Sequence, residues 1–155
     1  MSKKKKIKSV EFVESVKKQP KHSYEPTSWK GFNLSWQFNL LDMDTPWCKK
    51  YFKSQSDFYT DLLPILKQFE CINWFDLDKH THGYKGKSKH HNVDINDICQ
   101  QAQKRLSELK LDEYSDQLFS LRINATFRIW GIRESGYLKI LWFDPEHEVY
   151  PSGFN

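Results

Sequence analysis

The stretch FRIWGIRESGYLKILWFDPEHEVYPS, residues 127–152, largely decides the fold. Its strand-forming residues lie in two runs, residues 127–132 and 137–143, which the short segment RESG joins. Gly136 in that segment can adopt the positive φ of a tight turn, so the two runs predict an antiparallel hairpin. The second run is almost continuously apolar, as is typical of a strand covered on both faces. Pro145 cannot continue a strand, and the hairpin should therefore end directly before it.

The residues before the hairpin predict one more strand and two helices. Phe119, Leu121 and Ile123 alternate with polar residues, so a three-strand antiparallel meander is expected. Earlier in the chain, residues 56–69 and 94–109 carry apolar side chains at the spacing of one helical face. Each of these two segments begins with a side chain that can cap a helix.

A further strand is expected near the start of the domain, where Leu34, Trp36 and Phe38 alternate with polar residues. The predicted fold class is therefore α+β. Two helices pack on a curved antiparallel sheet, which consists of the C-terminal meander and this earlier strand. Residues 1–27 are polar and basic and are expected to form a flexible tail, and residues 28–155 a single α+β domain.

The composition is that of a soluble protein with an aromatic core. The 155 residues suffice for one domain, and 15% of them are aromatic. The three cysteines form no CxxC pair, so neither a disulfide framework nor a four-cysteine zinc site is expected. The net charge of +4 equals that of the lysines at positions 3–6, which suit a solvated tail or a phosphate-contacting arm. No apolar run is long enough for a membrane helix or a signal peptide, so a cytoplasmic location is expected.

Four residues around the meander have the chemistry to act on a phosphodiester. Arg122 and Arg128 share a face of the sheet if the loop between their strands has an odd number of residues. Arginine binds phosphate oxygens bidentately and stabilises the charge that develops in the transition state. His147 titrates near neutral pH and can move a proton, and Tyr150 can stack on a base or donate to an oxygen.

The same residues also have a purely structural interpretation. Exposed sheet faces commonly carry arginines, and the acidic residues Asp144, Glu146 and Glu148 follow the last predicted strand. They can form salt bridges with the arginines, in which case the segment DPEHEVYP only ends the folding unit. The sequence leaves both interpretations open.

A histidine-rich loop precedes the second predicted helix. Its histidines have the spacing HxH-x7-HH among lysines and glycines, and they are His80, His82, His90 and His91. The loop has three interpretations: a solvated segment, a contact with RNA or a partner, or a zinc site. The neighbouring lysines oppose a bound cation, so no metal is expected, nor any other cofactor. The candidate RNA-binding residues in this loop and in the meander are Lys87, Lys89, His91 and Arg133.

Several enzyme classes lack their sequence signatures. The chain has no Gly-rich phosphate loop, no GxSxG, no HExxH and no paired carboxylates of a metal nuclease. Nucleotide hydrolysis, serine hydrolysis and metalloprotease chemistry are therefore poor fits.

The C-terminal part of the chain resembles the RelE/ParE-type toxins of bacterial toxin–antitoxin pairs. LFSLR matches the first strand of the toxin pattern, FRIWGIR the second, YLKILWF the third and EHEVYP the end. The resemblance implies a RelE-like fold and an endoribonuclease that cuts mRNA without a metal, either free or on the ribosome. It also implies a cognate antitoxin as partner.

The resemblance further implies roles for individual residues. Arg122 and Arg128 would bind the scissile phosphate, His147 would act as acid or base, and Tyr150 would orient or stack the RNA. The ribose 2′-OH would be the nucleophile and a cyclic phosphate the product. Toxins of the ParE type bind a protein target instead, so a non-catalytic protein-binding accessory in phage defence is one alternative. A metal-dependent nuclease that uses the loop at residues 80–91 is another.

A longer pattern resembles a group of small bacterial and phage-associated proteins. It runs SW.F...D.D.PW, FE...W, AQ.RL.EL, LFSLR, R.WGIR and W.DPEH.V.PS. These segments extend from Ser35 to Ser152 and therefore include the predicted helices as well as the sheet.

Overall fold

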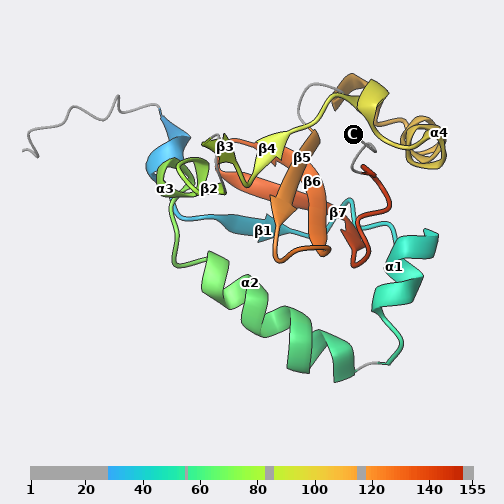
Figure 1. Ribbon diagram of the computed structural model, residues 1–155, viewed down its shortest axis with the longest axis horizontal. Helices are drawn as coiled ribbons and strands as arrows, with labels where there is room; N and C mark the ends of the chain where they lie inside the picture. Colours follow the sequence, from blue (N-terminus) through green and yellow to red (C-terminus); the bar gives the residue numbers. More distant parts are fainter. Residues whose placement is uncertain (1–27, 55, 83–85, 115–117, 152–155) are drawn as a thin grey trace, which may run out of the picture.

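The computed structural model describes residues 28–54, 56–82, 86–114 and 118–151 (Figure 1). The predicted basic tail, residues 1–27, lies outside the described residues, as do the side chains of His82 and Lys87. The described part is an α+β domain with a five-stranded sheet in the order β1-β7-β6-β5-β4. These strands are β1 (Ser35–Gln37), β4 (His91–Asn92), β5 (Leu118–Arg122), β6 (Arg128–Glu134) and β7 (Tyr137–Asp144).

Helices surround the sheet (Figure 1). The α-helices are α1 (Pro46–Tyr51), α2 (Leu63–Phe69), α3 (Trp74–Asp78) and α4 (Gln100–Glu108). The shorter elements are a π-helical turn (Phe58–Leu62) and 3-10 turns at Trp29–Gly31, Ile95–Asp97 and Asp112–Tyr114. A separate two-stranded ribbon pairs β2 (Thr81–His82) with β3 (Lys87–Ser88). The α+β class is confirmed, with four α-helices in the described residues where the sequence predicted two.

The C-terminal meander is also confirmed. β5, β6 and β7 are consecutive antiparallel strands, and β7 ends at Asp144, directly before Pro145. Trp130 lies opposite Trp142 across β6 and β7, and both side chains are fully buried. The two tryptophans are therefore core residues between the sheet and the elements that cover it.

The sheet is mixed rather than entirely antiparallel, which corrects the prediction from the sequence. β1 lies beside β7 and runs parallel to it, with Trp36 opposite Leu138. β4 adds a fifth strand, antiparallel to β5. Alternation of apolar and polar residues predicts a strand but neither its direction nor its neighbour. Both depend on the long crossover between β1 and β7.

The helix predicted over residues 56–69 is formed, with a π-helical turn within it, whereas the helix predicted over residues 94–109 is interrupted. Residues 94–109 divide into a 3-10 turn capped by Asp94 and the shorter helix α4. The N–H of Cys99 donates to the carbonyl of Val149 at 2.8 Å, and the backbone of Cys99 is extended at this contact. In the earlier segment, a π-helical turn precedes α2, and Pro64 lies in the first turn of α2. The missing N–H of Pro64 thus falls next to the π-helical turn, where the regular hydrogen bonding of the helix changes.

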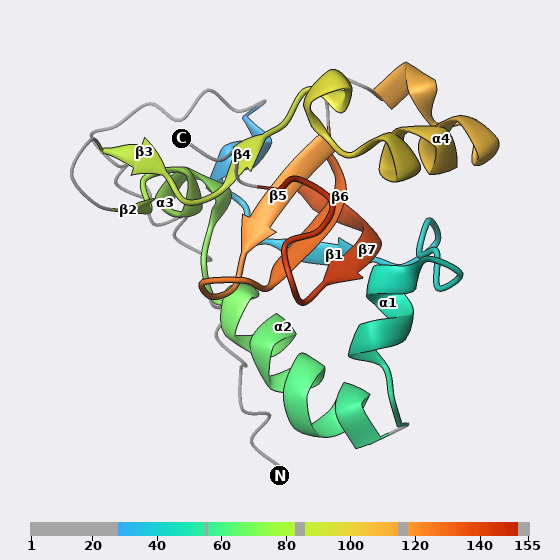
Figure 2. The ribbon, with the colours of Figure 1, turned by 45° about the vertical axis from the view of Figure 1, so that its right-hand side comes forward.

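Helices α2 and α4 cover opposite faces of the sheet (Figures 1 and 2). On one face, the indole N–H of Trp36 donates to the carbonyl of Leu66 in α2 at 3.3 Å. On the other face, Trp142 donates to Asp42 at 3.2 Å, and Arg105 of α4 binds the same carboxylate at 2.7 Å. The bond from Arg105 lowers the pKa of Asp42, which is buried. This ion pair ties α4 to the sheet.

The close approach of β6 and β7 at Gly131 leads to a first prediction. A methyl group at this position would lie 2.5 Å from the carbonyl oxygen of Lys139 and 2.9 Å from Cδ1 of Leu138. The oxygen belongs to the paired strand backbone and cannot move without disturbing the sheet. Gly131→Ala should therefore lower the free energy of unfolding by about 2–3 kcal/mol in a urea titration.

Gly86→Ala is the control for this prediction. Its Cβ would meet no described atom within 4 Å, and only the φ of 60° opposes the substitution. The cost should be about 1 kcal/mol. Equal losses of stability for the two variants would show that the contact between β6 and β7 is not tight at this point.

Candidate functional site

Arg122 and Arg128 lie directly opposite each other where the hairpin loop joins β5 to β6. The loop comprises residues 123–127, an odd number, so the condition for a shared face is met. His91 of β4 lies on the same face, because its cross-strand partner is Ser120, two residues before Arg122. Three basic side chains therefore gather on one face near this edge of the sheet.

The chain after β7 folds back in front of β5 and β6 in Figure 2, and Asp144 fixes this fold-back. The fully buried carboxylate of Asp144 accepts from the backbone N–H of Glu148 at 2.9 Å and of Val149 at 3.0 Å. It also accepts from the indole of Trp130 at 3.2 Å. His147 lies in the sequence between Asp144 and Glu148, and its backbone has a φ of 58°. Histidine adopts this conformation more readily than most residues. Asp144 is thus a positioning residue for the loop that carries His147.

His147 lies in the electrostatic field of the basic residues. Burial lowers the pKa of His147, and the positive charges of Arg128 and Arg122 lower it further, against the opposing charge of Asp144. The ring of His147 meets that of Tyr150 edge-on, with 6.3 Å between centroids. His147 is therefore neutral at pH 7 and able to accept a proton. The C-terminal cluster, as we refer to it, comprises His91, Arg122, Arg128, His147 and Tyr150.

Arg128 and Arg122 have different environments within this cluster. Arg128 is only 7% exposed. Its guanidinium donates to the carbonyls of Asn124 at 2.7 Å, Phe127 at 3.0 Å and Ala125 at 3.3 Å. These bonds hold the hairpin loop, so we assign Arg128 a positioning role. Arg122 is half-buried and donates from Nε to the carbonyl of Asn124 at 3.2 Å. The other N–H groups of its guanidinium are the better candidates for binding a phosphate.

The acidic residues of the C-terminal loop pair with a lysine rather than with the arginines. Nζ of Lys50 in α1 lies 2.9 Å from Glu146 and 2.7 Å from Glu148. These ion pairs are exposed and link the loop to α1. Of the three acidic residues considered from the sequence, Glu146 and Glu148 therefore pair with Lys50 instead of an arginine, and Asp144 accepts hydrogen bonds from Trp130, Glu148 and Val149. The positive charge of the cluster is not cancelled by ion pairs to Glu146 or Glu148.

Arg133 lies on the opposite face of β6, apart from the C-terminal cluster. It forms an ion pair with Asp78 at 2.7 Å, and its guanidinium lies 4.8 Å from the ring centroid of Phe119. Lys89 is exposed and lines the cavity described next. Lys87 belongs to β3, and its side chain lies outside the description.

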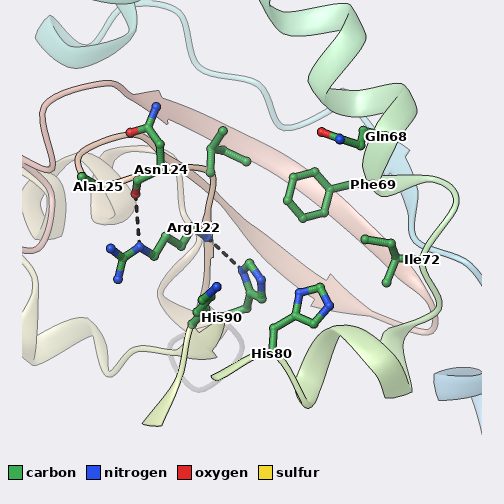
Figure 3. A pocket seen from close by; sticks show the side chains of 10 residues that line it. Gln68, Phe69, Ile72, His80, His90, Arg122, Asn124 and Ala125 are labelled. Carbon is green, nitrogen blue, oxygen red and sulfur yellow. Dashed lines mark hydrogen bonds between the residues drawn. The ribbon is translucent and has the colours of Figure 1, made fainter. Parts of the chain in front are cut away.

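A cavity of about 400 Å³ opens between the end of α2, the residues before β4 and the hairpin loop (Figure 3). We refer to it as the α2–hairpin cavity. Phe69 and the imidazoles of His80 and His90 line one part of it, and Arg122 and Asn124 border another. Arg122 therefore belongs both to this cavity and to the C-terminal cluster.

The histidine motif is divided between the two sides of β4. His90 is buried, and its Nδ1 accepts from the backbone N–H of Arg122 at 3.1 Å. The ring of His80 lies 5.6 Å from that of His90, whereas His91 follows on the face of the C-terminal cluster. Within the described part of the chain, no three or more His, Cys, Asp or Glu side chains are grouped to hold a metal ion.

His90 leads to a second prediction, on the pH dependence of stability. Burial lowers the pKa of His90 to about 4, and the charges of His80 and Lys89 contribute to the shift. In the unfolded chain the pKa lies near 6.5. Between pH 6.5 and pH 4 the unfolded state therefore binds a proton that the folded state does not. This contribution to stability is full above pH 6.5, and up to about 3 kcal/mol is lost as the pH falls through the window.

Urea unfolding at a series of pH values between 7 and 4 measures this dependence. His90→Asn is the matched control, because its side-chain oxygen can still accept from the N–H of Arg122 without titrating. The free energy of unfolding of this variant should fall less steeply with decreasing pH than that of the wild type. Parallel curves for the two proteins would refute a proton-linked role for His90.

Sequence reasoning missed two contributors to the site. Asp144 was considered as a salt-bridge partner, although an aspartate directly before a proline at a strand end is also a known turn-capping signal. Phe69 was assigned only to a buried helix face, and no local signal shows that it lines a cavity. That cavity is formed by three segments far apart in the sequence.

The chain is thus a mixed-sheet α+β domain with a histidine and arginine cluster beside its β5–β6 hairpin loop. Residues 36–155 match the sequence model of the family described as uncharacterised protein UU032, and the chain belongs to that family. The matched region includes every residue of the C-terminal cluster and of the α2–hairpin cavity. Comparisons with curated proteins and with solved structures gave no match.

None of the helices in the described residues combines the length and the hydropathy needed to span a membrane.

Proposed function

We propose that the protein is a metal-independent endoribonuclease of the toxin type, similar to the RelE/ParE toxins, with its active site at the C-terminal cluster. One arrangement carries the proposal: the loop fixed by Asp144 holds His147 in the field of Arg122 and Arg128, and burial lowers the pKa of His147. Cleavage by a ribose 2′-OH needs a base that is unprotonated near pH 7 and a cation that stabilises the phosphate.

In the proposed reaction, Arg122 binds the non-bridging oxygens of the scissile phosphate. His147 removes the proton from the 2′-OH, and the 2′ oxygen forms a bond to phosphorus. The bond from phosphorus to the 5′ oxygen of the next nucleotide breaks, and the departing oxygen takes a proton from solvent. The products are a 2′,3′-cyclic phosphate and a 5′-hydroxyl, and His147 returns its proton to solvent.

The remaining cluster residues act around this step. Tyr150 stacks on or orients the RNA, because its ring contacts the ring of His147, the proposed general base. His91 lies on the same face and can contact the RNA there. Arg128 keeps the hairpin loop, and with it Arg122, in place.

As a toxin, the protein would act in the cytoplasm on mRNA, free or on the ribosome, and a cognate antitoxin would restrain it. The C-terminal meander and the preceding helices support the likeness to the RelE fold. The parallel β1 and the additional β4 are features of this chain to which the resemblance does not extend.

Expression in a bacterial host tests the biological side of the proposal. Induction of the wild type should arrest growth and translation. Arg122→Ala should relieve the arrest, because it removes the phosphate contact. Lys79→Ala, at an exposed position beside Phe75 and outside the cluster, should stay toxic. A fully toxic Arg122→Ala variant would favour the alternative, in which the protein binds a protein target without catalysis.

A further inference from the structure

The α2–hairpin cavity has walls of two chemical kinds. Phe69 and Ile72 form an apolar wall at the end of α2, Lys89 brings a positive charge, and Arg122 and Asn124 border the space, with the side chain of Arg122 directed away from Phe69 (Figure 3). A volume of about 400 Å³ lies within the range of pockets that hold small organic ligands. A ligand that matches these walls has a flat apolar face and carries negative charge.

The aromatic part of the cavity is held in a defined arrangement. The ring of His90 meets Phe69 edge-on at 6.0 Å between centroids. Nδ1 of His90 accepts from the N–H of Arg122, which assigns the proton to Nε2. The hydroxyl of Ser88 donates to the carbonyl of His90 at 2.5 Å and fixes its backbone. His90 therefore presents a neutral ring with an N–H donor, which suits hydrogen bonding to the edge of a base.

The polar border is similarly held. The side-chain oxygen of Asn124 accepts from the N–H groups of Thr126 at 3.0 Å and Phe127 at 2.8 Å. Its carbonyl accepts from Arg122. The two positive side chains at this border, Arg122 and Lys89, can meet the phosphate of a bound nucleotide.

We propose that the α2–hairpin cavity binds one base of single-stranded RNA, stacked against Phe69, with its phosphate on Arg122 and Lys89. Arg122 belongs to both the cavity and the C-terminal cluster, so the bound base lies next to the scissile phosphate. This last step rests on the proposed function. The strand is single, because a base inside a duplex cannot place its face and edges in a cavity.

Fluorescence anisotropy with a 2′-O-methyl RNA oligonucleotide tests the inference. This probe has no 2′-OH and cannot be cleaved by the proposed reaction, so binding is measured separately from catalysis. Phe69→Leu keeps the apolar volume but removes the ring, and it should weaken binding roughly 10-fold. Lys89→Ala changes only an exposed residue, and it should weaken binding several-fold and reduce its salt dependence.

Tyr59→Leu is the matched control, because this ring is 69% exposed on the helical segment before α2 and is not among the cavity residues. It should leave the affinity unchanged. Probes with one base removed at each position in turn add a ligand-side test. For the probe that lacks the base bound in the cavity, Phe69→Leu should not weaken the affinity any further.

The outcomes separate this inference from the proposed function. Unchanged affinity in Phe69→Leu and Lys89→Ala would overturn the base-binding cavity even if the protein cleaves RNA. Equal weakening by Tyr59→Leu would overturn it as well. Binding that depends on Phe69 and on one base, in a protein that does not cleave RNA, would support the cavity and contradict the endoribonuclease.

Discussion

His147→Asn will lower the rate of RNA cleavage by about 10²–10⁴-fold, the range that a general base supplies. Asparagine tolerates the φ of 58° at this position, so the loop keeps its conformation while the proton acceptor is lost. The free energy of unfolding should change by about 1 kcal/mol or less. Single-turnover cleavage of a defined RNA and urea unfolding of the same preparation measure the two effects separately.

Glu146→Gln is the control for this variant. Glu146 belongs to the same loop but forms an exposed ion pair with Lys50, so its loss should leave the rate unchanged. The pH profile provides an independent readout. Because burial lowers the pKa of His147, the wild-type rate should rise with pH through a midpoint below 6.5. Wild-type activity in His147→Asn, or the same pH profile in the variant, would remove His147 from the mechanism.

Asp144→Ala will have the largest effect on stability, a loss of about 4 kcal/mol in the free energy of unfolding. The fully buried carboxylate accepts three hydrogen bonds, from Trp130, Glu148 and Val149. Alanine leaves these donors without their acceptor, and each buried unsatisfied group costs about 1–3 kcal/mol. The C-terminal loop should detach from the sheet and take His147 with it, so cleavage is also lost.

Two further variants make the Asp144 prediction specific. Asp144→Asn keeps one acceptor oxygen and should lose about half as much stability as Asp144→Ala. Asp94→Ala removes an exposed cap of the 3-10 turn, where the side chain accepts from Asn96 at 2.8 Å, and should cost about 1 kcal/mol. A loss in Asp144→Ala no greater than in Asp94→Ala would mean that the carboxylate does not hold the loop.

The parts of the fold that could be predicted from sequence are those whose signals are local. The meander follows from alternation, one glycine turn and Pro145, all within a short segment. The parallel pairing of β1 with β7 could not be predicted, because it joins Trp36 to Leu138 across most of the chain. The segment 94–109 is split by a contact between distant residues as well. The hydrogen bond from the N–H of Cys99 to the carbonyl of Val149 overrides the local helix propensity.

In the candidate site, too, the features with local signals could be predicted and those that depend on tertiary contacts could not. The shared face of Arg122 and Arg128 depends only on loop length, and the structure has the required odd number. The bonds of Arg128 to loop carbonyls and the pairing of Lys50 with Glu148 depend on side-chain packing and tertiary placement. Periodicity carries no information on either. The burial of His90 against Phe69 likewise follows from the position of α2.

The chemistry of the RNA ends tests the central claim most directly. An mRNA is incubated with the purified protein, alone and on ribosomes, and the new termini are identified. We predict 2′,3′-cyclic phosphate and 5′-hydroxyl ends, no cleavage by Arg122→Ala, and no cleavage where the nucleotide 5′ of the scissile bond is 2′-deoxy. Termini with a 5′-phosphate, or intact RNA under both conditions, would contradict the proposed endoribonuclease.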